Sequence, residues 1–275
     1  MTDSLTMGAI RERFGDDRVP VLALKAGADI LADPPHLPTA FRAVMDAVEG
    51  GTLSEERIDR SVERILRLKE RLGLLDDPMV DVDAVPESVG TKANQAVAEA
   101  VGNASVTVLQ LRPTRRLPVP EQWSILLTGW NDAGVRTLES ELQTAGRSVE
   151  ASWTPADPTD TEIDAVLRRA RKHDITVVVT GYLGAYPQQR QLVRDLIRQG
   201  RTIIVSARSP YDVGWFPSAP VLVATYGSTP VSMRALARII AGELGPTGTS
   251  PVRIPYPGRP QTRFPFGAGK TWEVP

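Results

Sequence analysis

The chain has 275 residues, of which 41% are hydrophobic and 24% charged, an ordinary globular composition that argues against wholesale disorder. Its 32 lysines and arginines nearly balance 33 aspartates and glutamates, so no field of one sign favours nucleic acid or an anionic membrane. The absence of cysteine excludes disulfides, thiolate metal sites and cysteine nucleophiles. No apolar run approaches the roughly 20 residues of a transmembrane helix, and Met-Thr-Asp-Ser does not begin a secretory signal. We expect no cofactor and no metal.

The first region, residues 1–75, is predicted to be mostly helical. Its apolar residues recur at helical spacing, and glycines stand where the helices are expected to end. Ala28–Ala32 is the exception, because this short apolar run before Asp33-Pro34-Pro35 predicts a buried strand. The predicted helices cover residues 7–14, 19–26, 37–49 and 55–72, the last with Ser54 as its N-cap.

Residues 76–93 are predicted to be a linker, since they hold two prolines, several acids and no sustained period. The second region, residues 94–275, alternates strand and helix patterns. Its strands include continuous apolar runs such as Val177–Val179 and Ile203–Val205, which are typical of a sheet covered on both faces. This pattern predicts an α/β domain of three layers with a mostly parallel sheet. The expected strands are 105–111, 124–128, 148–153, 175–180, 202–207 and 221–225, and the expected helices are 134–145, 162–172, 188–199 and 231–243.

Three blocks of sequence carry a more specific signal. The first is Thr2–Ile10, and the second runs from Ala23 to Leu74. The third combines Ser209–Asp212, Ala224–Tyr226 and Gly248–Val252. In this order the blocks resemble glycoside hydrolase family 3, and within it the bacterial β-N-acetylglucosaminidases that have both a barrel and an α/β sandwich domain.

The resemblance implies a fold, a reaction and one catalytic residue. Residues 1–75 would be the last units of a (β/α)₈ TIM barrel, and residues 94–275 the α/β sandwich domain. Asp3 would be the nucleophile, just past the seventh barrel strand, where the catalytic groups of such barrels lie. Enzymes of this kind retain configuration by double displacement, with an acid/base group about 5 Å from the nucleophile. The implied substrate is a carbohydrate with β-linked N-acetylglucosamine.

The resemblance also implies groups that this chain lacks. A lysine-histidine segment, sugar-binding arginine and aspartate side chains and a histidine-based acid/base belong to earlier barrel strands. We therefore expect the chain to be inactive alone and to need a missing N-terminal barrel segment, encoded upstream of a misassigned or frameshifted start. A strand at Ala28–Ala32 would then lack neighbours, and residues 1–75 would be loosely packed or need a partner. The alternative is a non-enzymatic α/β module that binds a carbohydrate or a protein.

Two histidines and one further aspartate are candidate site residues. His36 follows the last expected barrel strand and is a candidate for the active-site face, but a loop or helix-start position is the commoner role. His173 follows Arg171-Lys172 at the end of an expected helix, which indicates a solvated cation. Asp212 follows an expected strand, and a structural cap or an interdomain contact is favoured over ligand binding.

Two other patterns point to ordinary structure. Gly129–Gly134 follows a strand and opens a helix but lacks the lysine and hydroxyl residue of a phosphate loop, so a plain turn is expected. Asp81 and Asp83 in the linker are expected to be solvated acids.

Overall fold

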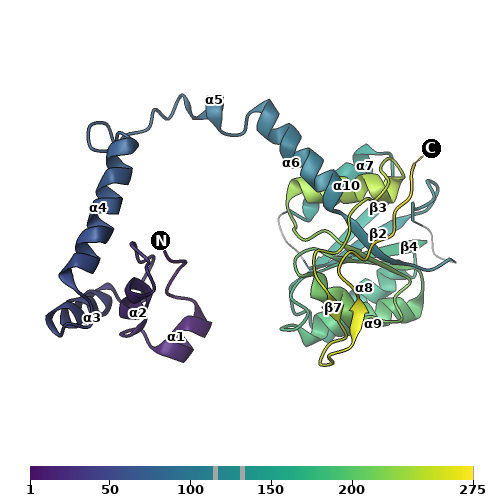
Figure 1. Ribbon diagram of the computed structural model, residues 1–275. Coiled ribbons are helices and arrows are strands. Elements are labelled where there is room, and N and C mark those ends of the chain that lie inside the picture. Colours follow the sequence, from purple (N-terminus) through teal and green to yellow (C-terminus); the bar gives the residue numbers. More distant parts are fainter. Residues whose placement is uncertain (114–116, 131–133, 275) are drawn as a thin grey trace. The chain divides into compact units, whose positions relative to one another are not determined.

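A computed structural model describes residues 1–113, 117–130 and 134–274. The chain divides into two units, Met1–Val85 and Pro86–Pro275, and each is described by itself (Figure 1). None of the helices in the described part of the chain has both the length and the apolar character that a membrane crossing requires.

The first unit holds four helices: α1 (Gly8–Phe14), α2 (Val19–Lys25), α3 (Leu37–Glu49) and α4 (Glu55–Arg71). α2 contacts both α1 and α3, and a small core of Leu24, Ala47 and Leu53 joins α2, α3 and the segment before α4. The predicted cap of α4 is confirmed, because Ser54 Oγ accepts the backbone N–H of Arg57 at 3.2 Å.

The expected strand at Ala28–Ala32 is reduced to a single parallel bridge between Ser4 and Ala32. The N–H of Thr2 donates to the carbonyl of Ile30 at 2.9 Å, and the N–H of Leu5 donates to that of Ala32 at 3.0 Å. The expectation that this segment has no neighbour is therefore wrong. Its neighbour is the segment that carries Asp3, because α1 and α2 form the long crossover that parallel pairing requires.

The second unit is an α/β domain in three layers, as predicted. Six strands form its main sheet in the order β1-β6-β5-β4-β2-β3, and within this sheet β1 alone is antiparallel to its neighbour. The strands are β1 (Thr107–Leu111), β2 (Ile125–Trp130), β3 (Val149–Thr154), β4 (Ile175–Thr180), β5 (Thr202–Ser206) and β6 (Val221–Ala224).

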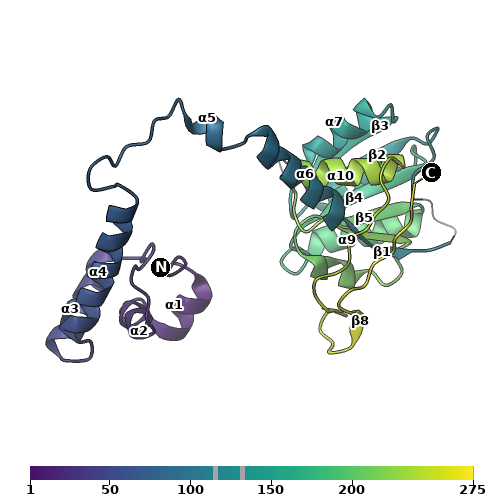
Figure 2. The same ribbon diagram turned by 45° about the horizontal axis from the view of Figure 1, so that its top comes forward.

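Helices cover both faces of this sheet (Figures 1 and 2). Side chains alternate between two cores, so that Val177 and Val179 of β4 join one core while Val178 joins the other. One core includes α7 (Arg136–Thr144) and α10 (Pro230–Ala241), and the other includes α8 (Asp160–Ala170) and α9 (Pro187–Gln199). Burial on both sides explains the continuous apolar strands.

Several elements of the second unit were not predicted from the sequence. α6 (Lys92–Ser105) precedes β1 and begins with a capping box, in which Thr91 and Asn94 bond each other's backbone N–H. A threonine followed three residues later by a side chain that can accept a hydrogen bond is typical of a helix start, so the sequence contained a signal for α6. The others are α5 (Val85–Ser88), the 3₁₀ helix η1 (Pro210–Trp215) and a hairpin of β7 (Ile254–Pro255) and β8 (Thr262–Phe264).

Candidate functional site

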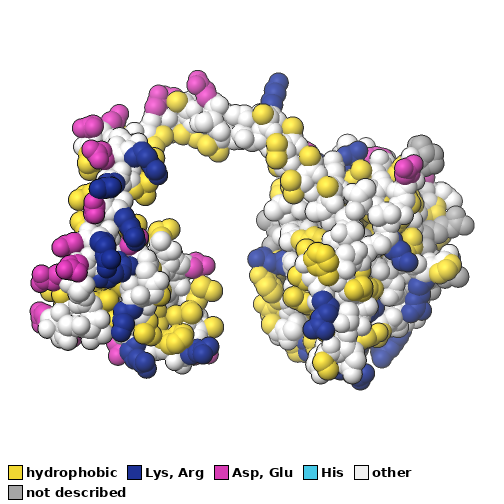
Figure 3. Space-filling model, viewed as in Figure 1, with side chains coloured by type: hydrophobic (Ala, Val, Ile, Leu, Met, Phe, Trp, Pro, Cys, Tyr) yellow, Lys and Arg dark blue, Asp and Glu magenta, His cyan; other side chains and the backbone are white. Residues whose placement is uncertain are grey.

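Asp3 lies exposed at the rim of a hollow of about 610 Å³ in the first unit. Its carboxylate Oδ1 accepts the backbone N–H of Ser4 at 2.8 Å. Figure 3 shows hydrophobic side chains gathered over α1 and α2, the helices that supply most of the hollow. Its apolar lining residues are Leu5, Met7, Ile10, Phe14, Val19, Leu22 and Ala23.

Among the described residues that line this hollow, Asp3 is the only one with an ionisable side chain. Retaining glycoside hydrolysis needs a second group, about 5 Å from the nucleophile, to donate and later remove a proton. The hollow therefore offers one carboxylate and an apolar wall. It provides a place for a nucleophile but not the acid/base group.

Asp33 fixes the loop next to Asp3, a role that was not predicted from the sequence. Its Oδ2 accepts hydrogen bonds from Ser4 Oγ at 2.8 Å and from Thr6 Oγ1 at 3.5 Å. Asp33 has φ +49°, a left-handed conformation that glycine, asparagine and aspartate adopt more readily than other residues. The available signal was an aspartate at the end of a predicted barrel strand, immediately before two prolines.

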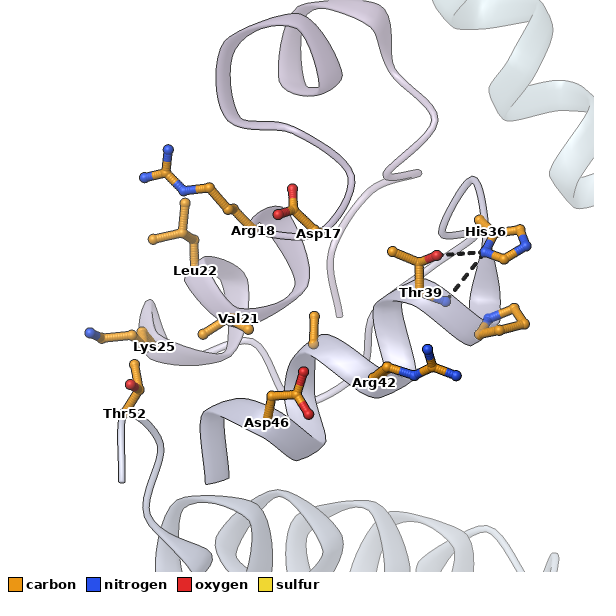
Figure 4. A pocket seen from close by; sticks show the side chains of 12 residues that line it. Asp17, Arg18, Val21, Leu22, Lys25, His36, Thr39, Arg42, Asp46 and Thr52 are labelled. Carbon is orange, nitrogen blue, oxygen red and sulfur yellow. Dashed lines mark hydrogen bonds between the residues drawn. The ribbon is translucent and has the colours of Figure 1, made fainter. Parts of the chain in front are cut away.

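His36 caps α3 and does not line the hollow that holds Asp3. Its Nδ1 lies 2.6 Å from Thr39 Oγ1 and accepts the N–H of Thr39 at 3.3 Å. The ring borders a different pocket of about 490 Å³ between α2 and α3 (Figure 4). The helix-start interpretation of His36 is confirmed.

A charged cluster around Asp29 joins α4 to the end of α2. Arg57 donates to the carbonyls of Leu24 at 3.1 Å and Ala28 at 2.8 Å, and Arg64 donates to both oxygens of Asp29 at 3.1 and 3.2 Å. The hydrogen bond from Ser61, followed by the two arginines, lowers the pKa of Asp29. The cluster thus holds the segment that pairs with the Asp3 strand.

In the second unit, Asp212 supports the loop that follows β4. Its side chain is 4% exposed, and Oδ1 accepts the N–H of Leu183 at 3.2 Å. Burial raises the pKa of Asp212 to about 6. Oδ2 is buried and has no hydrogen-bond partner among the described residues. The cap predicted for Asp212 is not formed, and the side chain instead anchors a neighbouring loop of the same unit.

The prediction for His173 is wrong. α8 ends at Ala170, and the His173 side chain is only 10% exposed, with Nε2 3.4 Å from Glu150 Oε2 and Nδ1 3.0 Å from the Arg169 carbonyl. The ring is held by its acidic neighbour on β3, which lies far away in sequence and therefore left no local signal.

The remaining candidates have ordinary structural roles where they are described. Gly129 has φ +102°, and a Cβ there would lie 2.2 Å from the Val179 carbonyl, so close strand packing explains this glycine. Residues 131–133 of the same segment lie outside the described residues. Asp81 and Asp83 are exposed, and the Asp81 carboxylate accepts the N–H of Asp83 at 3.0 Å.

Comparison with known proteins places this arrangement in a family. Residues 9–271 match the family model described as the glycosyl hydrolase family 3 C-terminal domain. A lysosomal β-glucosidase of Dictyostelium discoideum is 28% identical over 86% of this chain and 34% of its own length. A β-N-acetylglucosaminidase/β-glucosidase of Cellulomonas fimi is 24% identical over 92% of this chain and 48% of its own. The chain thus spans half or less of the length of these relatives.

Solved structures agree with this assignment. A family 3 β-N-acetylglucosaminidase from Paenibacillus sp. str. FPU-7 superposes with a TM-score of 0.75 at 29% identity, covering 90% of this chain and 49% of that one. A β-glucosidase from Listeria innocua gives a TM-score of 0.72 at 20% identity, which supports the fold alone. From the family match over residues 9–271 and these structural neighbours, the chain belongs to glycoside hydrolase family 3.

Proposed function

We propose that this chain is the C-terminal part of a retaining β-glycosidase that acts on β-linked N-acetylglucosamine, with Asp3 as the nucleophile. The observation that carries the proposal is the position of Asp3, in a segment paired in parallel with Ile30–Ala32 and bordering an open hollow. Catalytic carboxylates of barrel enzymes extend from such strand ends. The similarity to the Paenibacillus enzyme supports the N-acetylglucosamine specificity over glucose.

The residues that line the hollow indicate which catalytic groups this chain supplies and which must come from elsewhere. Asp3 would attack the anomeric carbon, while Ser4 and Asp33 hold its loop through the bond from Ser4 Oγ to Asp33 Oδ2 at 2.8 Å. A barrel segment outside this chain would supply the acid/base and the groups that bind the sugar. The chain alone is therefore expected not to turn over glycosides, and residues 1–75 are proposed to be the part of the barrel that receives this segment.

A chimera tests the proposal. The barrel segment of the Paenibacillus enzyme that precedes the matched region is fused to Met1 and assayed on chromogenic β-N-acetylglucosaminide and β-glucoside. We expect turnover of the N-acetylglucosaminide, its loss by at least about 10³-fold in Asp3→Asn, and no loss in the exposed-carboxylate control Asp17→Asn. A soluble chimera in which Asp3→Asn keeps full turnover would exclude Asp3 as the nucleophile. A preference for the glucoside would exclude the proposed substrate.

A second candidate function, a non-enzymatic binding module, is favoured by the single carboxylate of the hollow. The chimera and the unfused chain together distinguish the two functions. A 5-fluoro-N-acetylglucosaminyl fluoride, which keeps the 2-acetamido group, loses its anomeric fluoride to the nucleophile and traps the glycosyl-enzyme, would label Asp3 in the chimera if the enzyme hypothesis is right. An unlabelled chimera together with saturable sugar binding by the unfused chain would favour the module.

A further inference from the structure

The carboxyl ends of three adjacent strands in the second unit meet at a change of winding direction. The sheet order places β4 between β2 and β5. From β2 the chain adds β3 at one edge, then returns to β4 and continues to β5 and β6 in the opposite direction. In open α/β sheets, ligands bind outside the carboxyl ends of the strands at this switch point.

Two aromatic rings and one cation occupy this position. Trp130 ends β2, Tyr182 follows β4, and Arg208 follows β5. The two rings meet edge to face with centroids 6.3 Å apart. The Arg208 guanidinium lies 4.8 Å from the centre of the Tyr182 ring and 5.5 Å from that of Trp130. The cation is thus placed by cation–π contacts with both rings.

Arg208 differs from the other stacked arginine of this region. Arg190 lies 4.6 Å above the Trp215 ring, but it also donates to the carbonyls of Leu183 and Gly184, so its hydrogen-bonding capacity serves the fold. No described residue forms a hydrogen bond or ion pair with Arg208, whose side chain is exposed. Within the described part of the chain, its fork of donors, which matches the geometry of a carboxylate, is not used by another group.

Buried side chains anchor the backbone of the loop that follows β4 and carries Tyr182. Gln189, which is fully buried, accepts the N–H of Gly181 at 2.9 Å, and Asp212 accepts that of Leu183 at 3.2 Å. Tyr182 itself has φ +57°, an unfavourable conformation for an aromatic residue, yet its ring is 47% exposed. Strain maintained by buried anchors beneath an exposed ring is typical of a binding site and pre-organises it.

One acceptor of this cluster is unsatisfied. Asp212 Oδ2 is buried beneath the same loop and has no well-aligned hydrogen-bond partner among the described residues, although the backbone N–H groups of Leu183 and Tyr182 both act on this carboxylate and partly offset the rise in its pKa that burial causes. Buried polar atoms without partners are rare in native proteins and often mark functional positions. Asp212 is committed to the loop backbone and does not pair with Arg208.

We propose that Trp130, Tyr182 and Arg208 form a binding site for an acidic sugar residue, whose carboxylate accepts a forked pair of hydrogen bonds from Arg208 while its pyranose ring packs against the part of the Tyr182 side chain that the guanidinium leaves exposed. The aromatic surface suits the apolar C–H face of a sugar ring. The free guanidinium selects the anion. This site does not depend on Asp3 or on turnover.

Binding is tested with the full chain and three probes. These are methyl β-D-glucuronide, the neutral methyl β-D-glucoside, and acetate, which carries the charge without the ring. Titrations followed by NMR at the indole N–H of Trp130 and the Nε–H of Arg208 should show the glucuronide binding about tenfold or more tighter than either other probe. Arg208→Gln should reduce glucuronide binding to the level of the glucoside. Tyr182→Asn, which tolerates positive φ, should weaken both sugars.

Arg201→Gln is the matched control, because the Arg201 guanidinium also stacks on a tryptophan, 4.6 Å from the ring centre of Trp123. It should leave glucuronide binding unchanged. Equal binding of acetate and glucuronide, retention of binding in Arg208→Gln, or an equal loss in Arg201→Gln would each overturn the proposal. Arg208 is exposed, and unchanged melting temperatures of the variants exclude misfolding as the cause of any loss.

Discussion

Ser4 Oγ donates to Asp33 Oδ2 at 2.8 Å, so a side-chain bond joins the ends of the two paired segments of the first unit. Ser4 directly follows Asp3 and gives its own backbone N–H to the Asp3 carboxylate. The proposed nucleophile is therefore held through its neighbour by an aspartate 30 residues away in sequence.

Asp33→Ala is expected to loosen this junction. The change removes the bonds from Ser4 and Thr6, which contribute about 1–2 kcal/mol, and leaves alanine in a left-handed conformation that costs about 1–2 kcal/mol more. Asp33→Gly removes the same bonds without the conformational cost. Exchange of the Leu5 amide, which donates to Ala32, should be fastest in Asp33→Ala and intermediate in Asp33→Gly. Asp17→Ala should leave it unchanged, and equal rates in all variants would exclude this role for Asp33.

Asp212→Asn is expected to stabilise the second unit at neutral pH. Burial raises the pKa of Asp212 from 3.8 to about 6, so its protonated form is favoured in the folded state. This contribution is fully present below pH about 4 and is lost as the pH rises through about 6, a change of about 3 kcal/mol. Urea unfolding at pH 4 and pH 7 should show that the variant gains over the wild type only at pH 7.

Asp174→Asn is a control, because the pKa of Asp174 is shifted in the opposite direction to that of Asp212. Bonds from the backbone and side chain of Ser124 lower the pKa of Asp174, so its stabilisation is present at neutral pH and lost in acid. This variant should be less stable than wild type at pH 7 and approach it in acid. The same pH trend in both variants would contradict the assignment of the Asp212 effect to burial.

Gly181→Ala is expected to disturb the ring cluster. A Cβ at this position would lie 2.6 Å from Trp130 Cε3, so the ring must move. Such overpacking costs about 1–3 kcal/mol, and each kcal/mol lowers the melting temperature of a unit of this size by about 2–4 °C. Gly184→Ala meets no atom within 4 Å and should change stability by less than about 0.5 kcal/mol. Equal melting temperatures for the Gly181→Ala and Gly184→Ala variants would show that the Trp130 ring can move without loss of stability.

Arg57→Lys is expected to weaken the attachment of α4. The Arg57 side chain is 15% exposed and bonds two backbone carbonyls at once, which a lysine ammonium on its flexible stem cannot reproduce. The expected loss is about 2 kcal/mol, measured as urea-dependent hydrogen exchange of α4. Arg67→Lys is the control, because Arg67 forms a surface ion pair with Glu63 and its side chain is 75% exposed. This substitution should lower the free energy of unfolding by less than about 0.5 kcal/mol. A similar loss in both would contradict the prediction.

Local patterns were enough for most of the second unit. β4 was predicted with its observed bounds, Ile175–Thr180, because a strand buried on both faces is apolar throughout. The hydroxyl of Ser54 identified the start of α4 for a similarly local reason. Prediction failed where the partner is distant in sequence, as for His173 and Glu150 and for the pairing of Ala32 with Ser4.

The family, the three-layer α/β fold and the assignment of Asp3 as the candidate nucleophile could be inferred from the sequence, since they depend on periodicity and on short segments in a fixed order. The side chains around Asp3, the attachment of its loop to Asp33, and the meeting of Trp130, Tyr182 and Arg208 became visible only in the folded chain. These residues come from separate strand ends, and the crossover helices bring them together. Local sequence patterns predict the strands, but they do not predict which strand ends become neighbours. That depends on the order in which the strands pair in the sheet.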